Sequence, residues 1–126
     1  MNDIRQPYTP GERQPTPTAE ITIGEPCPEG YEELDRVLFE AFGQAAHGKG
    51  KRRHANELPF PDQPIMKISS MVGLGGLAYQ IIKKAQEAVS MNARGEHDAA
   101  IAEYRGAIIY AAAAILLIEG KRDGSK

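Results

Sequence analysis

The stretch that decides the fold is Ala107–Ile118, which reads AIIYAAAAILLI. All twelve of its residues are apolar except Tyr110. A run of this length is too short to span a bilayer, so it predicts a buried helix. A helix that is apolar on every side must be surrounded, and a single neighbouring helix cannot surround it. The stretch therefore predicts an all-α protein that associates symmetrically with copies of itself.

Helical spacing extends this run into a helix from about Glu96 to Glu119, preceded by a turn at 92–95. A second helix is expected to begin near Ile65 and to be interrupted at Gly73-Leu74-Gly75-Gly76. Three glycines in four residues would cost a continuous helix about 2–3 kcal/mol relative to alanine. We therefore expect a break, a new helix N-terminus at Gly75–Gly76, and an antiparallel hairpin between the last two helices.

Another helix is predicted from near Glu29 to about Ala46, packed across this hairpin. Its first turn holds Glu29, Glu32 and Glu33, whose charges favour the helix dipole. Gly48 is a plausible stop signal. These helices make residues 29–120 a single helical domain for ligand binding and oligomerisation.

The segment 1–28 has a different composition, because it contains six of the nine prolines and few large apolar residues. It cannot bury a core, so an extended or disordered arm is expected. Its strand-like piece is Ile21-Thr22-Ile23. The last residues, 121–126, are expected to be a disordered tail.

A cytoplasmic location is expected from two features. Cys27 is the only cysteine, so no intrachain disulfide can form, as is usual in a reducing compartment. The N-terminus also has no charged-then-apolar pattern of a secretion signal.

The segment Gly48–His54 reads GKGKRRH and carries four permanent cations. The whole chain has a net charge of −2, so the rest carries −6. A local positive patch on a negative body suits a small anionic ligand better than long nucleic acid, which needs a broad basic face. A solvated basic loop is the alternative interpretation.

Residues 48–64 form one long predicted loop, which Pro59, Pro61 and Pro64 stiffen. Loops of this length are uncommon unless they are functional or disordered. The glycine break supplies a second anion-binding feature, because free N–H groups at a helix N-terminus bind phosphate. A close helix–helix contact would explain those glycines equally well.

These features together predict a nucleotide site in which each group has a role. Cations would bind phosphates, His54 and Phe60 would stack on a base, and Asp62 and Gln63 would hold a ribose or a base edge. The candidate ligand-binding residues are Lys49, Lys51, Arg52, Arg53, His54, Phe60, Asp62, Gln63, Gly75, Gly76, Lys83 and Lys84.

Several chemistries have no motif here, so no cofactor, metal site or catalytic residue is predicted. The P-loop pattern is absent, and the glycines at 73–76 do not follow a strand as in a dinucleotide fingerprint. The candidate zinc ligands lie at unsuitable spacings; they are His47, His54, His97, Asp98, Asp62 and Glu57. No serine or cysteine has the surroundings of a nucleophile.

A magnesium-dependent nucleotide pyrophosphatase of the MazG type is the enzymatic alternative. That fold needs Glu-x-x-Glu and a later Glu-x-x-Asp on facing helices to hold magnesium. Glu29 and Glu32 provide the first motif, but no Glu-x-x-Asp occurs further along the chain on a facing helix.

A pattern spread over residues 31–120 resembles a family of small uncharacterised phage proteins. It consists of Gly48-Lys49-Gly50-Lys51, His54-Ala55, Pro59-Phe60, Asp62-Gln63-Pro64, Gly73-Leu74-Gly75, Lys83-Lys84 and Gly106-Ala107-Ile108. In size and helical-oligomer character the chain also resembles the Sequestin and Lockin families. This second resemblance is an analogy of architecture.

The analogy implies a phage anti-defence protein acting in the infected bacterial host. Sequestin-type proteins bind cyclic or conjugated ADP-ribose signals of Thoeris defence, and their relatives bind the cyclic dinucleotides of CBASS. The expected function is sequestration of such a signal, including His-ADP-ribose, without cleavage. The alternatives are the MazG-like hydrolase and a module that binds an acidic host protein.

Overall fold

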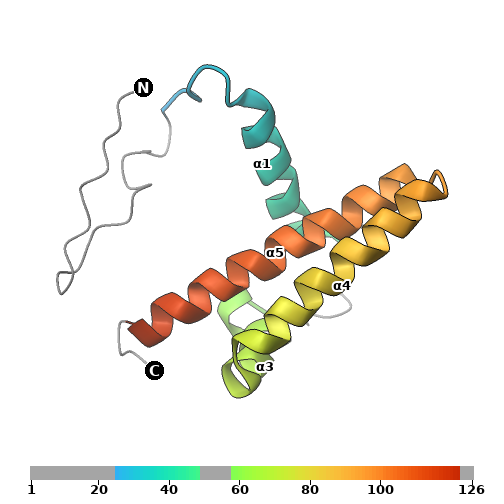
Figure 1. The fold of residues 1–126 in the computed structure, drawn as a ribbon. Coiled ribbons are helices and arrows are strands. Elements are labelled where there is room, and N and C mark those ends of the chain that lie inside the picture. The colour runs from blue at the N-terminus through green and yellow to red at the C-terminus, as the bar shows by residue number, and fades with distance from the viewer. Residues whose placement is uncertain (1–24, 49–57, 123–126) are drawn as a thin grey trace, which may run out of the picture. The chain divides into compact units, whose positions relative to one another are not determined.

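The computed structural model describes residues 25–48 and 58–122, and all regular structure within them is helical (Figure 1). The chain divides into two units, Met1–Glu32 and Glu33–Lys126. The helices are α1 (Glu32–His47), the 3₁₀ helix η2 (Phe60–Asp62), α3 (Pro64–Val72), α4 (Leu74–Ala93) and α5 (His97–Arg122). The all-α prediction is confirmed. Most of the predicted arm, 1–24, and the end of the predicted tail, 123–126, lie outside the described residues.

The hairpin predicted for the last two helices is present, as α4 and α5 lie side by side (Figure 1). The turn between them is closed by Gly95, with φ of 82°, and by the Glu96 N–H donating to the Met91 carbonyl at 2.9 Å. The core of this unit forms where α4 meets α5 and contains Leu77, Ala113 and Leu117, with η2 and α3 packed against it.

The predicted break in the second helix is present, but at Gly73 and not at Gly75–Gly76. Gly73 ends α3, where its N–H donates to the Ser69 carbonyl, and it is also the N-cap of α4. Its φ of 88° with ψ of −176° lies in a region that is essentially reserved for glycine. Gly75 and Gly76 lie one residue or more inside α4, so the predicted N-terminus was placed slightly late.

The predicted start of the first helix was three residues too early. Glu29 lies in a turn closed by the Tyr31 N–H donating to the Pro28 carbonyl at 3.1 Å, and Gly30 has φ of 91°. A helix cannot pass through a residue in that conformation. Glu32 and Glu33 do occupy the first turn, and the Glu32 carboxylate accepts a hydrogen bond from the Gly30 N–H.

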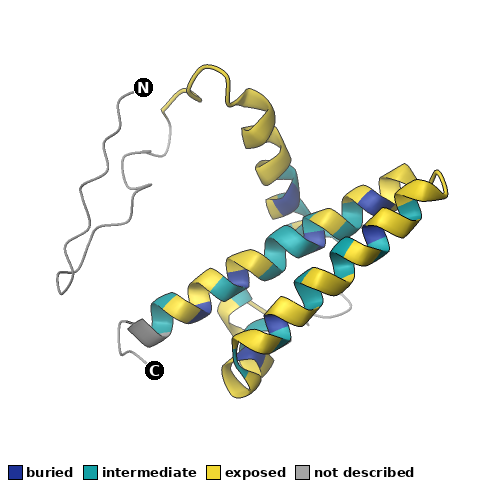
Figure 2. Ribbon diagram, in the orientation of Figure 1, coloured by how far each residue is buried: buried dark blue, intermediate teal, exposed yellow. Residues whose placement is uncertain are grey.

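The described part of the chain does not enclose α5, although the sequence predicts a buried helix. Ile115, Leu116 and Ile118 are about half exposed, and Figure 2 shows exposed positions along both helices of the hairpin. By length and composition alone, His97–Gly120 is a 24-residue helical segment that is long and apolar enough to cross a membrane. The core helix of a soluble protein can meet the same test.

Candidate functional site

An apolar cavity of about 530 Å³ lies within the unit that begins at Glu33. Its walls come from one face of α1, from η2 and the residues beside it, and from one flank of α5. The lining residues are Leu38, Ala41, Phe42, Ala45, Ala46, Leu58, Pro59, Phe60, Gln63, Ile108, Ile109, Ala112 and Leu116.

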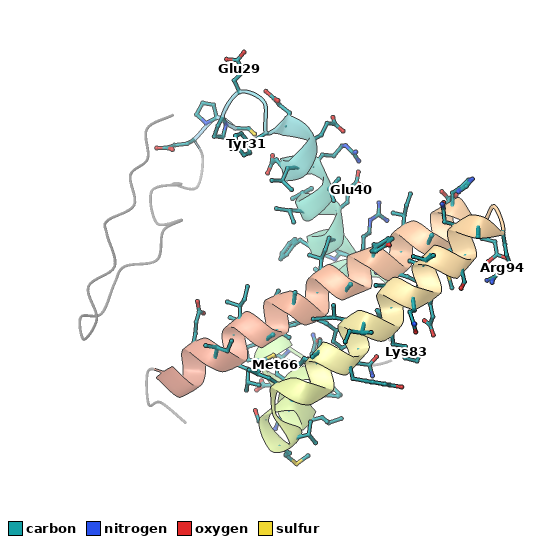
Figure 3. All side chains as sticks on the ribbon, in the orientation of Figure 1. Glu29, Tyr31, Glu40, Met66, Lys83 and Arg94 are labelled. Carbon is teal, nitrogen blue, oxygen red and sulfur yellow. The ribbon has the colours of Figure 1, made fainter. Side chains whose placement is uncertain are left out.

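Two polar contacts hold α1 against α5 beside this cavity. The Gln44 side-chain amide donates to the Ala102 carbonyl at 3.1 Å. The Arg105 guanidinium donates to the Glu40 carboxylate at 2.8 Å. Arg36 also contacts Glu40, at 3.1 Å, so one carboxylate on α1 is shared by two arginines. Figure 3 labels Glu40 on α1. These contacts fix the two helices that form opposite walls of the cavity.

The Glu40 carboxylate is electrostatically stabilised by this arrangement. Hydrogen bonds from Arg36 and then Arg105 favour its charged form and lower its pKa below the ordinary 4.5. Glu40 is therefore held as an anion, and it serves to position α1.

The floor of the cavity is tied to the protein core through η2. Phe60 lines the cavity and packs against the core cluster of Leu77, Ala113 and Leu117. Gln63 caps the C-terminal end of η2, and its side-chain amide donates to the Leu58 carbonyl at 2.8 Å. Gln63 is the polar residue among the lining residues, so it brings an amide group to an otherwise apolar wall.

The structure therefore brings together two of the predicted site residues, Phe60 and Gln63, in one cavity. Asp62 belongs to η2 but is exposed and does not line the cavity. The cations Lys49, Lys51, Arg52 and Arg53, together with His54, lie outside the described residues. Both flanks of that segment reach the cavity, because Ala46 and Leu58 line it.

The glycines predicted to bind phosphate are not part of this cavity. The Gly76 N–H donates to the Gly73 carbonyl at 3.3 Å, so it is already engaged within the first turn of α4. Gly75 is exposed in the same turn.

The two predicted lysines of α4 are each paired with a carboxylate. The Lys83 ammonium lies 2.8 Å from Glu87, and that hydrogen bond raises the pKa of Lys83. The Lys84 ammonium lies 3.2 Å from Glu103 on α5 and 5.9 Å from the centre of the Tyr110 ring. Neither side chain lines the cavity, and Lys84 joins α4 to α5.

Sequence reasoning missed the walls that α1 and α5 supply. The residues Leu38, Phe42, Ile109, Ala112 and Leu116 were not among the predicted site residues, yet they line the cavity. A signal was available in α1, where Phe39 and Phe42 add apolar surface beyond the stripe that a single contact needs. Periodicity alone cannot tell a filled interface from a cavity.

Acidic and metal-binding groups do not cluster in the described ranges. No three histidine, cysteine, aspartate or glutamate side chains among residues 25–48 and 58–122 lie close enough to hold a metal ion. The MazG-type alternative places Glu29 and Glu32 in the first unit and its partner carboxylates in the second. Within the second unit, Glu40, Glu87 and Glu103 are engaged with basic side chains.

Comparison of the chain with models of protein families, with curated proteins and with solved structures finds no match.

Proposed function

We propose that this protein binds a small nucleotide and sequesters it without cleaving it. The observation that carries the proposal is the apolar cavity between α1, η2 and α5. In the sequence, the cationic segment lies between two of its lining residues, Ala46 and Leu58. The base would enter the cavity, and the phosphates would meet the cations at its mouth.

The size and chemistry of the cavity support this proposal. A volume of about 530 Å³ falls in the usual range for small-molecule sites, which are mostly apolar with a few polar groups. Phe60 offers an aromatic surface for stacking, and Gln63 offers an amide for a base edge. These are groups for recognition, whereas hydrolysis would need positioned carboxylates and a metal.

The proposal includes self-association of the protein. The apolar side chains of α5 that face away from α4, such as Ile115 and Ile118, are about half exposed in one chain. Contact with further copies would remove this apolar surface from water.

The biological setting rests on the resemblance to phage proteins described above. It makes the ligand a nucleotide immune signal, such as a cyclic ADP-ribose, His-ADP-ribose or a cyclic dinucleotide. The protein would inhibit Thoeris or CBASS in the cytoplasm of the infected host. A MazG-like hydrolase and a host-protein interaction module are the competing functions.

Titration calorimetry of purified protein against these nucleotides tests the site with two variants. Ala112→Phe fills the cavity, and the pair Lys51→Glu with Arg52→Glu reverses charge in the cationic segment. Each is expected to weaken binding at least tenfold. The matched controls are Ala93→Phe, at an exposed position of α4, and the pair Lys67→Glu with Arg94→Glu, also on exposed residues.

The controls are expected to bind as the parent protein does. If both test variants keep the parent affinity, the cavity is not the binding site. If only Ala112→Phe weakens nucleotide binding, the ligand enters the cavity but does not use these cations.

A further inference from the structure

One side of the α4–α5 hairpin carries exposed apolar side chains from both helices, and we call this side the open face. Its large members are each between 47% and 63% exposed in the described chain: Ile82, Val89, Ile101, Tyr104, Ile115 and Ile118. The cavity described above adjoins this face on α5, where it is lined by Ile108, Ile109, Ala112 and Leu116.

The open face on α5 has the spacing of a helix–helix seam. Positions 101, 104, 108, 111, 115 and 118 alternate steps of three and four, and all of them are apolar except Tyr104. Such a heptad stripe, sustained over nearly the whole helix, is typical of packing against another helix. The buried positions of α5, Ala100, Ala113 and Leu117, are not part of this stripe, so the stripe does not serve the contact with α4.

The matching stripe on α4 follows the same rule. Positions 78, 82, 85, 89 and 92 also alternate steps of four and three, and none of them is charged. Val89 and Asn92 line a shallow hollow together with Ile101 and Tyr104, so the two stripes lie on the same side of the hairpin. Ile82 lies one heptad before Val89 and therefore shares its face.

We infer that the open face is a two-fold interface with a second copy of this chain, in which two α4–α5 hairpins form a four-helix bundle. A hairpin with heptad stripes on both helices is complementary to itself, as a two-fold interface requires. Helix α4 has 20 residues, so a face two helices wide offers roughly 600 Å². That area approaches the ~800 Å² per partner of a stable dimer.

Other exposed apolar side chains do not meet these conditions. Ile68, Met71 and Val72 are exposed on α3, which has only nine residues and one such row.

A lipid bilayer covering the open face would require no heptad spacing, because lipid tails have no grooves into which ridges of side chains could pack.

The dimer deepens the proposed self-association, but it does not rest on nucleotide binding. The cavity and the open face share Ile108, but nucleotide binding and self-association are measured independently. The two proposals can therefore fail separately.

Sedimentation equilibrium of the full chain tests the dimer. The parent protein is expected at twice its chain mass of 13.7 kDa. Val89→Glu with Ile115→Glu would place four carboxylates in the bundle and raise the dimer dissociation constant by about a hundredfold or more. Both residues are exposed in one chain, at 62% and 56%, so the helical circular dichroism of the monomer should persist.

The matched control is Met71→Glu, a residue 77% exposed on α3, which is expected to leave the dimer intact. A monomeric parent protein would overturn the inference, and flotation of that monomer with phosphatidylcholine vesicles would assign the open face to a lipid surface. A double variant that stays dimeric would show that self-association uses another surface. If the parent protein is monomeric but a variant without residues 1–24 dimerises, the inference is also overturned, and the open face is assigned to binding the arm.

Discussion

At the scale of single residues, Gly73 has a backbone conformation that side chains other than glycine rarely adopt. Its φ of 88° and ψ of −176° separate α3 from α4. An alanine would meet no atom within 4 Å there, so the cost of replacing Gly73 is conformational and not steric.

We expect Gly73→Ala to lower the free energy of unfolding by about 1–3 kcal/mol, the usual cost of placing a side chain in this region. Gly75→Ala is the matched control, because position 75 is helical and also has open space around it. It should be neutral or stabilise by up to ~1 kcal/mol. Urea denaturation measures both, and equal effects of the two substitutions would contradict this account of the break.

The Glu40 carboxylate gives a pH-dependent prediction. Its pKa in the folded protein is lowered, chiefly by hydrogen bonds from Arg36 and Arg105. A lowered pKa adds stability at pH values above the unfolded pKa, and that stability is lost as the pH falls through the folded value. Parent protein should therefore exceed Glu40→Gln in stability at neutral pH, and this difference should shrink below about pH 4.5.

Denaturant midpoints measured from pH 7 to pH 3 on both proteins provide this comparison. Glu87 and Glu96 also have lowered pKa values, so the pH dependence of the parent protein's stability alone does not isolate Glu40. A difference between parent and variant that is independent of pH would show that Glu40 acts through packing and not through its charge.

At the scale of elements, the contact between α4 and α5 depends on a glycine that makes room for a lysine. A Cβ atom at Gly106 would lie 2.9 Å from the Lys84 Cδ and Cε atoms. The Lys84 side chain passes over this glycine to reach Glu103 at 3.2 Å and the Tyr110 ring. The two helices are thus held in register by a small residue, a cation and a carboxylate.

A double-mutant cycle on Gly106→Ala and Lys84→Ala tests this arrangement. Alone, Gly106→Ala gains helix propensity of ~1 kcal/mol but displaces Lys84, so its net effect should be close to zero. In the Lys84→Ala background the displacement is absent, and the same substitution should stabilise by about 1 kcal/mol. Thermal denaturation of the four proteins gives the coupling energy, and additive effects would contradict the account.

Local sequence rules predicted which helices exist better than they predicted the residues at which the helices begin and end. The three-glycine cluster at 73–76 identified the break, because propensity disfavours a helix there regardless of tertiary context. Which glycine adopts the positive φ was not predictable, since all three are able to. The start of α1 was misplaced because Gly30 and the turn at Pro28 outweighed the favourable charge of Glu29.

At the scale of the whole molecule, the apolar run at 107–118 did predict an all-α protein, and the described chain leaves much of α5 uncovered. The cavity could be predicted only in part. Phe60 and Gln63 were predicted because they lie close after the basic segment and offer a ring for stacking and an amide for a ribose or base edge. The walls of the cavity on α1 and α5 depend on the distance between these two helices. That separation is set by tertiary contacts such as Gln44 with Ala102, which no sequence period encodes.

The central claim is that a nucleotide is bound and left intact, and a thermal-shift screen with recovery of the ligand tests it most directly. The panel contains cyclic dinucleotides, cyclic ADP-ribose isomers, His-ADP-ribose and ordinary nucleoside triphosphates. A ligand at a hundredfold excess over its Kd should stabilise the protein by about 2.7 kcal/mol. We predict a large shift with one class of signal, recovered unchanged and abolished by Ala112→Phe. A shift in melting temperature with none of them, or recovery of a cleaved product that a chelator prevents, would contradict the claim.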